Sequence, residues 1–475
     1  MSGRRPARSL TARDVLAIAV ARGIAWTVRR GGRGGTSLPG LIATRLSPGV
    51  DARAARLLAG AVLVSGTNGK TATSKLLATI LRASGYTVIA NASGANLRQS
   101  VATVLIGAIS LRGRLRHART VAVLEVDEAA LPGIRAWLPA DVMVMTNLFR
   151  DQLDRFGETD HLIRLWTAML ASDREAGTLV YCADDPRLAA LVAVGGGSLR
   201  AYGMDGPPPV RATAALTREL ATCPVCGGPL AMTWTGTAHL GDYRCDRCGF
   251  DRPALDLAVA PVARRGLDGE TLRFRWGGAE TETVELALPG LGNTYNAAAA
   301  VSAAVALGIE PRSAIRALAA ATTPFARFET LSMDGRRVVL SLLKNPAGMG
   351  EVSDIAAGSP VDTVLVAVNN AHADGRDVSW YWDCSPAALL EDRRFVVSGS
   401  RCLDFLLRAR YAIQDDPAGD PPGFVDTVPD PVAGLDRAVA VTPAGGMVLV
   451  VATYTALLGI RAALVDRSLL PAMPR

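Results

Sequence analysis

The sequence predicts an α/β protein in two parts, each built on a parallel β-sheet, and three observations support this prediction. Short apolar segments alternate with helical patterns in the first part of the 475-residue chain, which is typical of a doubly wound parallel sheet. Residues 207–265 interrupt the alternation with a proline run and two pairs of cysteines, and the alternation starts again after about residue 321. Hydrophobic residues make up 49% of the chain and charged residues 20%, which excludes a disordered protein, a collagen or a coiled-coil rod.

The apolar segments locate the expected strands. In the first part we expect strands at residues 61–65, 87–90, 121–126, 142–146 and 179–182, each followed by a helix. Two more strands, at 271–276 and 283–288, precede an alanine-rich helix at 293–307. In the second part we expect strands at 337–342, 363–368 and 448–451, a helix at 401–411 and a final helix after the last strand.

Residues 1–57 are expected to form a helical segment in front of the first strand. An arginine-rich amphipathic helix is followed by a glycine-rich break at residues 31–35 and a second short helical stretch. The apolar run at 15–28 is broken by Arg22 and does not fit a signal peptide. The apolar run at 447–460 is too short to span a bilayer. We therefore expect no transmembrane segment.

Charge and cysteine content exclude further classes of protein. The net charge of +7 is small for this length and much of it lies in the first 35 residues, so it does not indicate a nucleic-acid-binding protein. Seven cysteines are too few for a disulfide scaffold, which favours a cytoplasmic location. A contact of residues 1–57 with the inner membrane surface stays an open alternative.

The strongest motif lies at residues 61–71, which read AVLVSGTNGKT. An apolar strand runs into a glycine-rich turn and then a helix, an arrangement that offers free backbone N–H groups to a phosphate. Lys70 would contact the β- and γ-phosphates of ATP and the Thr71 hydroxyl would bind Mg²⁺. The first glycine of the full G-x-x-x-x-G-K-[ST] pattern is absent because Val64 stands there, so an ordinary glycine-rich turn is the alternative. The residues expected to bind the nucleotide are Gly66, Thr67, Asn68, Gly69, Lys70 and Thr71.

Lysine is scarce in this chain, which makes its positions informative. Only Lys70, Lys75 and Lys344 are lysines, and every other residue among the 51 Lys and Arg is arginine. A lysine kept in a glycine-rich turn therefore indicates a need for a compact ammonium group. Lys344 lies between a predicted strand and a helix, where we expect it to face the nucleotide or an acyl phosphate. An ordinary surface lysine is the alternative.

Four cysteines predict a structural zinc site. Two C-x-x-C pairs are separated by eighteen residues, a spacing typical of zinc ribbons. The expected ligands are Cys223, Cys226, Cys245 and Cys248. Four thiolates complete a tetrahedron and leave no open position for catalysis, and a redox role of the paired thiols is the alternative. His239 lies between the pairs, where we expect a plain strand residue.

The glycine-rich turn resembles the ATP-binding loop of the Mur ligase family, which also includes folylpolyglutamate synthetase. Further segments of that family follow in order: LEVD at 124–127, TNLFRDQLDRFG at 146–157, LPGLGNTYN at 288–296 and FARFE at 325–329. The resemblance covers residues 58–475. It implies an ATP-binding central domain at 58–320 with a zinc-ribbon insertion at about 210–260, and a C-terminal α/β domain at 321–475.

The resemblance also implies roles for single residues. Glu125 would bind Mg²⁺, and Asn147 and Asp151 would orient the metal or the substrate. The segment that contains Asn293 and Asn296 would lie near the adenine. Arg327 would belong to the link into the C-terminal domain.

Several departures from the family pattern point to its MurT subfamily. Gln152 stands where most Mur ligases have a histidine that binds a second metal ion, and residues 159–176 contain no lysine that could be carboxylated. Ala326 and Gly292 replace a usual glycine and histidine. The resemblance to MurT implies ATP-dependent amidation of the α-carboxyl of D-isoglutamate in lipid II, through an acyl phosphate, during peptidoglycan synthesis. A Mur-type or folate-type ligase that adds an amino acid is the alternative, followed by another amidating ligase or a non-enzymatic regulator.

The ammonia for this reaction has to come from another protein. A triad glutaminase needs an activated cysteine on a tight turn with a histidine partner. Cys182, Cys384 and Cys402 lack this context, so a separate glutaminase subunit is required. The MurT resemblance implies the glutaminase GatD as the partner in a heterodimer.

One loop of the C-terminal part is expected to serve that partner. Residues 369–383 read NNAHADGRDVSWYWD and follow an apolar strand, which indicates a functional loop at the carboxyl edge of a sheet. In MurT proteins an aspartate of this loop completes the Cys–His pair of the glutaminase. We expect Asp377 in that role, with Asp374 as second choice. A solvated turn whose aspartates cap a helix is the alternative.

Overall fold

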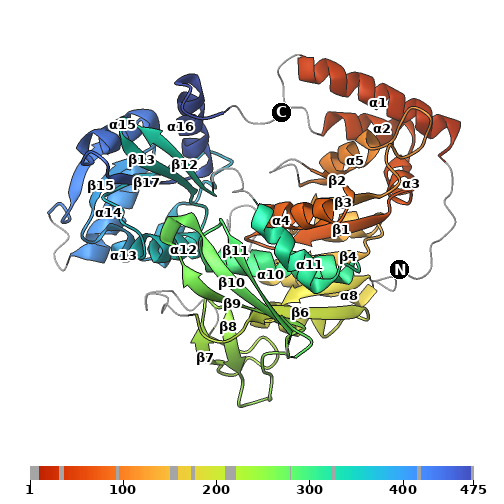
Figure 1. Ribbon diagram of the computed structural model, residues 1–475, viewed down its shortest axis with the longest axis horizontal. Coiled ribbons are helices and arrows are strands. Elements are labelled where there is room, and N and C mark those ends of the chain that lie inside the picture. The colour runs from red at the N-terminus through yellow and green to blue at the C-terminus, as the bar shows by residue number, and fades with distance from the viewer. Residues whose placement is uncertain are drawn as a thin grey trace.

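The protein forms two large β-sheets flanked by helices, as predicted (Figure 1). The computed structural model describes residues 10–30, 37–91, 96–149, 159–172, 177–208, 221–278, 280–321, 327–414 and 419–471. The glycine-rich break expected at 31–35 lies outside these residues. Among the described helices, none has both the length and the apolar character that crossing a membrane requires.

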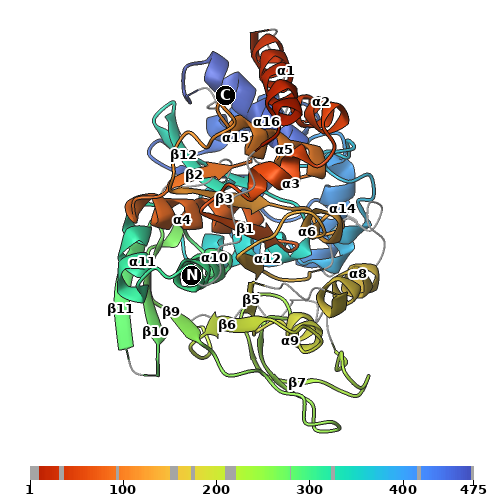
Figure 2. The same cartoon turned by 90° about the vertical axis from the view of Figure 1, so that its right-hand side faces the viewer.

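Among the described residues before the first strand there are three helices: α1 (Ala12–Arg30), α2 (Leu38–Leu46) and α3 (Val50–Ala55). Their apolar faces share one small core with α5 (Arg98–Gly107), in which Ile18 and Ile106 are buried. This bundle lies at the opposite end of the molecule from strand β7 (Ala231–Thr235) (Figure 2).

A buried carboxylate ties this bundle together. Asp14 of α1 accepts hydrogen bonds from the Ser47 hydroxyl at 2.6 Å and from the Arg53 guanidinium at 2.7 Å. Burial opposes its ionisation, but the hydrogen bonds from Arg53, Ser47 and Thr11 hold the pKa of Asp14 well below its usual range.

The first sheet has nine strands in the order β11-β10-β9-β6-β5-β4-β1-β3-β2. In this order, all neighbouring strands from β9 through β6, β5, β4, β1 and β3 to β2 pair in parallel. At the other side, β9 pairs antiparallel with β10, and β10 with β11. The parallel part has the crossover connections of a doubly wound sheet. The strands are β1 (Gly60–Ser65), β2 (Thr87–Ala90), β3 (Thr120–Glu125), β4 (Val142–Met145), β5 (Thr178–Cys182), β6 (Ser198–Met204), β9 (Leu257–Arg264), β10 (Glu270–Trp276) and β11 (Glu280–Leu286).

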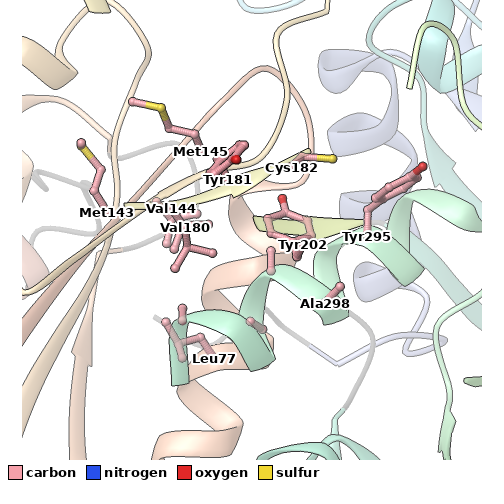
Figure 3. Packing of buried hydrophobic residues seen from close by; sticks show 14 of the residues in the cluster. Leu77, Met143, Val144, Met145, Val180, Tyr181, Cys182, Tyr202, Tyr295 and Ala298 are labelled. Atoms are coloured by element: carbon pink, nitrogen blue, oxygen red, sulfur yellow. The ribbon is translucent and has the colours of Figure 1, made fainter. Parts of the chain in front are cut away.

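Helices α4 (Lys70–Ala83) and α10 (Leu291–Ala306) pack side by side on one face of this sheet. The alanines of α10 allow this close approach, since most of its residues are fully buried. Figure 3 shows the resulting core, with Val144 and Val180 pointing toward Leu77 and α10. The other α-helices that the structure describes in this part are α6 (Leu131–Arg135), α8 (Thr159–Ser172), α9 (Pro186–Val192) and α11 (Pro311–Ala317).

The second sheet has six strands in the order β12-β13-β17-β14-β15-β16, all parallel except β12. Its central strands are buried on both faces, because separate apolar cores cover the two sides. The strands are β12 (Arg327–Met333), β13 (Arg336–Leu342), β14 (Thr363–Ala367), β15 (Arg394–Ser398), β16 (Phe424–Val428) and β17 (Met447–Ala452). The helices are α12 (Pro346–Ala357), α13 (Ala387–Leu390), α14 (Cys402–Ile413), α15 (Pro431–Val441) and α16 (Tyr454–Asp466).

The sequence did not predict β6, β9, β12, β15 and β16, nor the two strands of a separate antiparallel hairpin, β7 (Ala231–Thr235) and β8 (Gly241–Arg244). Strand β6 begins with three exposed residues and β16 is only half-buried along its length, so neither shows a clean apolar run. Strand β9 falls inside the expected interruption at 207–265, which therefore ends earlier than predicted, at Leu257. Its Pro261 lies beside a bulge, where a missing N–H is tolerated.

Candidate active site and metal centre

The predicted phosphate-binding turn lies between β1 and α4, at the carboxyl edge of the nine-stranded sheet. Two of its glycines have backbone angles that favour glycine, and both lie very close to neighbouring residues. Gly66 has φ 132°, and a Cβ there would lie 2.2 Å from the Thr146 hydroxyl. Gly69 has φ 88°, and a Cβ there would lie 2.0 Å from Oδ1 of Asn296. Any side chain would therefore push the turn away from both neighbours.

The loop after β4 holds this turn in place. Asn147 accepts from the backbone N–H of Asn68 at 2.8 Å and donates to its carbonyl at 3.1 Å. The Thr146 hydroxyl donates to the same carbonyl at 2.7 Å. Asn147 was expected to orient metal or substrate, but both ends of its amide fix the backbone of the turn. Asp151 and Gln152, farther along this loop, lie outside the described residues.

Lys70 opens α4 and its ammonium group is almost fully enclosed. It donates to the Gly66 carbonyl at 2.5 Å and the Thr67 carbonyl at 3.2 Å, and it pairs with Glu128 at 3.2 Å. Glu128 is buried as well, so each group compensates the charge of the other. The sequence analysis did not identify Glu128, although it stands three residues after Glu125 at the end of the same strand.

The expected metal-binding oxygens lie together. The Thr71 hydroxyl donates to Oε2 of Glu125 at 2.7 Å, and Asn91 fixes the backbone of Glu125 at both its N–H and its carbonyl. A hydroxyl and a carboxylate are ligands that Mg²⁺ accepts. Lys75 is one turn farther along α4; burial lowers its pKa against the opposing charges of Glu125 and Glu329.

The two asparagines predicted near the adenine project from the first turns of α10. Asn293 donates to the Pro289 carbonyl at 2.7 Å and accepts from Nδ2 of Asn296 at 3.2 Å. Oδ1 of Asn296 accepts from the Thr73 hydroxyl of α4 at 3.3 Å. Because Asn296 also lies against Gly69, the structure brings this segment to the phosphate-binding turn.

The C-terminal part reaches the same turn. Asn345 caps α12 by accepting from the N–H of Gly348 at 3.0 Å, and its amide donates to Oδ1 of Asn68 at 3.0 Å. Lys344, the preceding residue, is half-buried at this junction. Arg327 is the first residue of β12, and its side chain lies outside what the structure describes.

The four cysteines form one cluster. Their sulfur atoms all lie within 4.8 Å of one another, with Cys223 and Cys248 3.7 Å apart and Cys226 and Cys245 3.6 Å apart. A zinc tetrahedron with Zn–S bonds of about 2.3 Å has sulfur–sulfur edges of about 3.8 Å, so the cluster has the size of a zinc site.

The backbone around the cluster repeats one turn twice. The N–H of Gly227 donates to the Cys223 carbonyl and that of Gly249 donates to the Cys245 carbonyl, each at 2.9 Å. Desolvation opposes ionisation of Cys245, yet backbone N–H groups and neighbouring thiols lower its pKa to about 7. A backbone N–H favours the Cys248 thiolate, but desolvation and the other thiols raise its pKa to about 12. Ionisation of one thiol thus makes ionisation of its neighbour less favourable, and a bound divalent cation would offset the repulsion between the thiolates.

The two candidate aspartates of the C-terminal loop differ sharply. Asp374 is buried and accepts from the backbone N–H of Thr455 at 2.7 Å and from its hydroxyl at 2.5 Å, so it ties the loop to the start of α16. Asp377 is exposed, and its Oδ1 accepts from the N–H of Ser379 at 2.8 Å. Of the two carboxylates, only that of Asp377 faces outward.

Comparison with known protein families gives matches to both parts of the chain. Residues 64–221 match the Mur ligase middle domain, and residues 342–457 match the MurT ligase C-terminal domain. The two matched regions contain the phosphate-binding turn and the loop of Asp377, respectively.

Named relatives and a solved structure agree with these matches. The MurT subunit of lipid II isoglutaminyl synthase (glutamine-hydrolyzing) from Streptococcus pneumoniae (strain ATCC BAA-255 / R6) is 32% identical over 374 residues, which cover 78% of this chain and 80% of that protein. The MurT subunit from Staphylococcus aureus (strain N315) is 28% identical and covers 80% and 84%. A pseudomurein peptide ligase type C from Methanothermus fervidus has the same fold, with a TM-score of 0.65, 19% identity and coverage of 86% and 79%.

Proposed function

The chain belongs to the MurT group of the Mur ligase family, and from this membership we propose that it is the synthetase subunit of a lipid II isoglutaminyl synthase. The observation that carries the proposal is the junction at Asn68. There the phosphate-binding turn of the Mur-type part touches Asn345 of the part that matches MurT proteins. A nucleotide on the turn would thus lie against the domain that matches the MurT C-terminal family model.

The first step would activate the α-carboxyl of D-isoglutamate in lipid II. One carboxylate oxygen attacks the γ-phosphorus of ATP, the bond from this phosphorus to the β,γ-bridging oxygen breaks, and ADP leaves with the electron pair. Lys70 would turn from Glu128 toward the phosphate oxygens and neutralise charge as it develops. Thr71 and Glu125 would hold Mg²⁺, which supplies further positive charge at the phosphates.

The second step would form the amide. Ammonia attacks the carbonyl carbon of the acyl phosphate, and the tetrahedral intermediate expels phosphate with the electron pair of the broken C–O bond. The nitrogen then releases its extra proton, and D-isoglutamine results. Lys344, half-buried at the junction between the two parts, is the cationic side chain that we propose for the acyl phosphate.

A glutaminase of the GatD type would supply the ammonia. We propose that Asp377 reaches this partner and orients its catalytic histidine. Its outward position supports this role, and so does the surface beside it. Trp382 is 51% exposed and lies 5.6 Å from the ring of Tyr411, while Leu403 and Leu407 extend the apolar surface along α14. We call Leu403, Leu407, Tyr411 and Trp382 the α14 patch and propose it as part of the partner's docking surface.

The cysteine cluster would hold one structural Zn²⁺. Its four sulfur atoms have the spacing of a closed site, and the chain leaves no coordination position for a substrate. Cys245→Ser should lose one equivalent of zinc and lower the Tm, because metal binding contributes directly to folding. Metal analysis of the unaltered protein checks this, and finding no zinc would contradict it.

Reconstitution tests the proposed function. The chain, its glutaminase partner, lipid II, ATP and glutamine are combined, and mass spectrometry of the stem peptide identifies the product. Conversion of the D-isoglutamate carboxyl to an amide, dependent on ATP, supports the proposal. Addition of an amino acid instead, with no amidation, would show an amino-acid-adding ligase.

A further inference from the structure

The hairpin that carries the cysteine cluster also reaches the phosphate-binding turn. A small open hollow lies beside Gly69, between α10 and α12. One of its walls comes from Thr237 and Leu240, which connect β7 (Ala231–Thr235) and β8 (Gly241–Arg244). The other walls are Asn68, Gly69, Asn147, Phe149, Gly292, Tyr295, Asn296, Ala347 and Glu351.

A buried contact between His239 and Asp185 fixes the tip of this hairpin, residues 236–240. His239 was expected to be a plain strand residue, but it lies in the turn, is 3% exposed and places Nε2 3.2 Å from Oδ1 of Asp185. The other oxygen of Asp185 accepts from the N–H of Leu148 at 2.8 Å. The ring of His239 meets Phe149 edge-on at 5.1 Å. The hairpin tip is therefore attached to the loop after β4, which itself holds the phosphate-binding turn.

A second attachment joins the hairpin to α10. Asp184 accepts from the Tyr295 hydroxyl at 2.7 Å and from Nε of Arg252 at 2.8 Å, and its carbonyl accepts from the N–H of Gly241 at 2.9 Å. All polar atoms of the Asp184 side chain are buried in this network. Because Tyr295 lines the hollow, a shift of β8 would move this wall as well.

The cysteine cluster lies at the other end of the same strand. Cys245 directly follows β8, so four residues separate it from Leu240 in the hollow. Ala238 has φ 51°, a strained backbone angle for alanine that the surrounding contacts must maintain. Fixing Cys245 with a metal ion would therefore fix the register and position of β8, and with it the strained tip.

We propose that the hairpin tip is a wall of the nucleotide site and that the metal at the cysteine cluster sets nucleotide affinity through β8. This inference rests on the proposed function, because it takes the ligand of the turn to be ATP. It gives the zinc ribbon a role in substrate binding in addition to its role in folding. His239 acts in it as a positioning residue, not as a ligand of the nucleotide.

A pair of tryptophan substitutions on one hairpin tests the wall. Thr237→Trp would fill the hollow, whereas Thr233→Trp places the same side chain on the exposed face of β7. Calorimetry with a non-hydrolysable ATP analogue should show binding at least about tenfold weaker for Thr237→Trp and within about twofold of the unaltered protein for Thr233→Trp. Zinc content and Tm are measured on both variants, and equal values exclude a folding defect.

Removal and return of zinc tests the link between the metal and nucleotide affinity. This experiment uses the unaltered protein, so it can be done even if Thr237→Trp does not fold. At a temperature where circular dichroism shows that the zinc-free protein is still folded, we expect chelation to weaken binding of the ATP analogue at least about tenfold, with recovery when Zn²⁺ is added back. Unchanged affinity after complete zinc removal would overturn the link, and equal affinity of both tryptophan variants would overturn the wall. If the unaltered protein binds no ATP analogue, the proposed function fails instead, so the two failures are distinguishable.

Discussion

The carboxyl edges of the two parallel sheets carry the loops proposed to be functional in this protein, and they differ in one respect. At the edge of the nine-stranded sheet the candidate groups are enclosed: Lys70 is 9% exposed and Glu125 is 7% exposed. At the edge of the six-stranded sheet Asp377 faces solvent beside the α14 patch, where Leu403 is 67% exposed. The first edge assembles its polar partners within one chain, whereas the second presents a carboxylate and an apolar surface outward.

This difference teaches that the two edges perform different tasks. Enclosed, mutually hydrogen-bonded groups are preorganised for charge development in a desolvated site. The role proposed for Asp377, an outward carboxylate near exposed apolar side chains, is to act on the partner that docks there. The comparison therefore predicts that changes at the first edge affect chemistry with any nitrogen source, and changes at the second affect only what the partner provides.

The largest effect is expected at the enclosed edge. Lys70→Ala should abolish ATP-dependent amidation with glutamine and with free ammonia alike, because the phosphates lose their ammonium partner. The variant also leaves Glu128 buried without its cation, so its Tm should fall. Adding Glu128→Gln should restore much of the Tm but none of the activity. Full activity of Lys70→Ala with either nitrogen source would refute the phosphate-binding assignment.

The next effect concerns the outward edge. Asp377→Asn should reduce glutamine-dependent amidation by about 100-fold or more, because the partner's histidine loses its orienting carboxylate. Amidation driven by free ammonia should be unchanged, since the nucleotide site lies on other residues. Both reactions are followed side by side with the assembled complex.

Asp374→Asn is the matched comparison for that experiment. Because Asp374 holds Thr455 at the start of α16, its loss should lower the Tm. Amidation with glutamine and amidation with free ammonia should be affected to the same extent. If Asp374→Asn separates them and Asp377→Asn does not, the loop is correct and the choice of aspartate is wrong. Equal failure of Asp377→Asn with both sources would assign it to the synthetase site or the fold.

A smaller effect is expected from the α14 patch. Leu407→Arg places a charge among exposed apolar side chains, so the affinity for the glutaminase partner should fall at least about tenfold. Leu111→Arg is the control and should bind normally, because Leu111 is also an exposed leucine (59%, against 45% for Leu407) but lies outside the α14 patch. Ultracentrifugation or calorimetry measures the assembly. Normal binding by Leu407→Arg would move the docking surface away from α14.

The smallest effect on activity is expected from a change in the N-terminal bundle, which lies away from both edges. The folded pKa of Asp14 is depressed, so its contribution to stability is present above the unfolded value near 3.8 and is lost as pH falls from there. Asp14→Asn should lower the Tm at neutral pH and make the Tm less sensitive to acid below about pH 4. Both amidation reactions should be unaffected at neutral pH. A pH profile of Tm identical to that of the unaltered protein would contradict the role of the Asp14 network.

Structure could be predicted from the sequence most accurately where the pattern lies within a short segment of the chain. The strand, turn and helix around Lys70 and the two C-x-x-C pairs are contiguous or closely spaced, and both were placed correctly. The half-buried strand β16 was missed because exposed residues hide its pattern. Glu128 was missed for another reason: its importance comes from a contact with Lys70, 58 residues away.

By itself, then, the amino-acid sequence determined the α/β class, the strand, glycine-rich turn and helix around Lys70, and the grouping of four cysteines, and it singled out the loop of Asp377 as a candidate. These follow from short-range periodicity and from residue types that chemistry requires at fixed spacing. Only the tertiary structure decided that Asn147 holds the turn, that Asp374 is buried while Asp377 is not, and that the hairpin tip lies beside Gly69. The physical reason is that burial and side-chain partners depend on contacts between distant segments, such as Asn68 with Asn345, 277 residues apart.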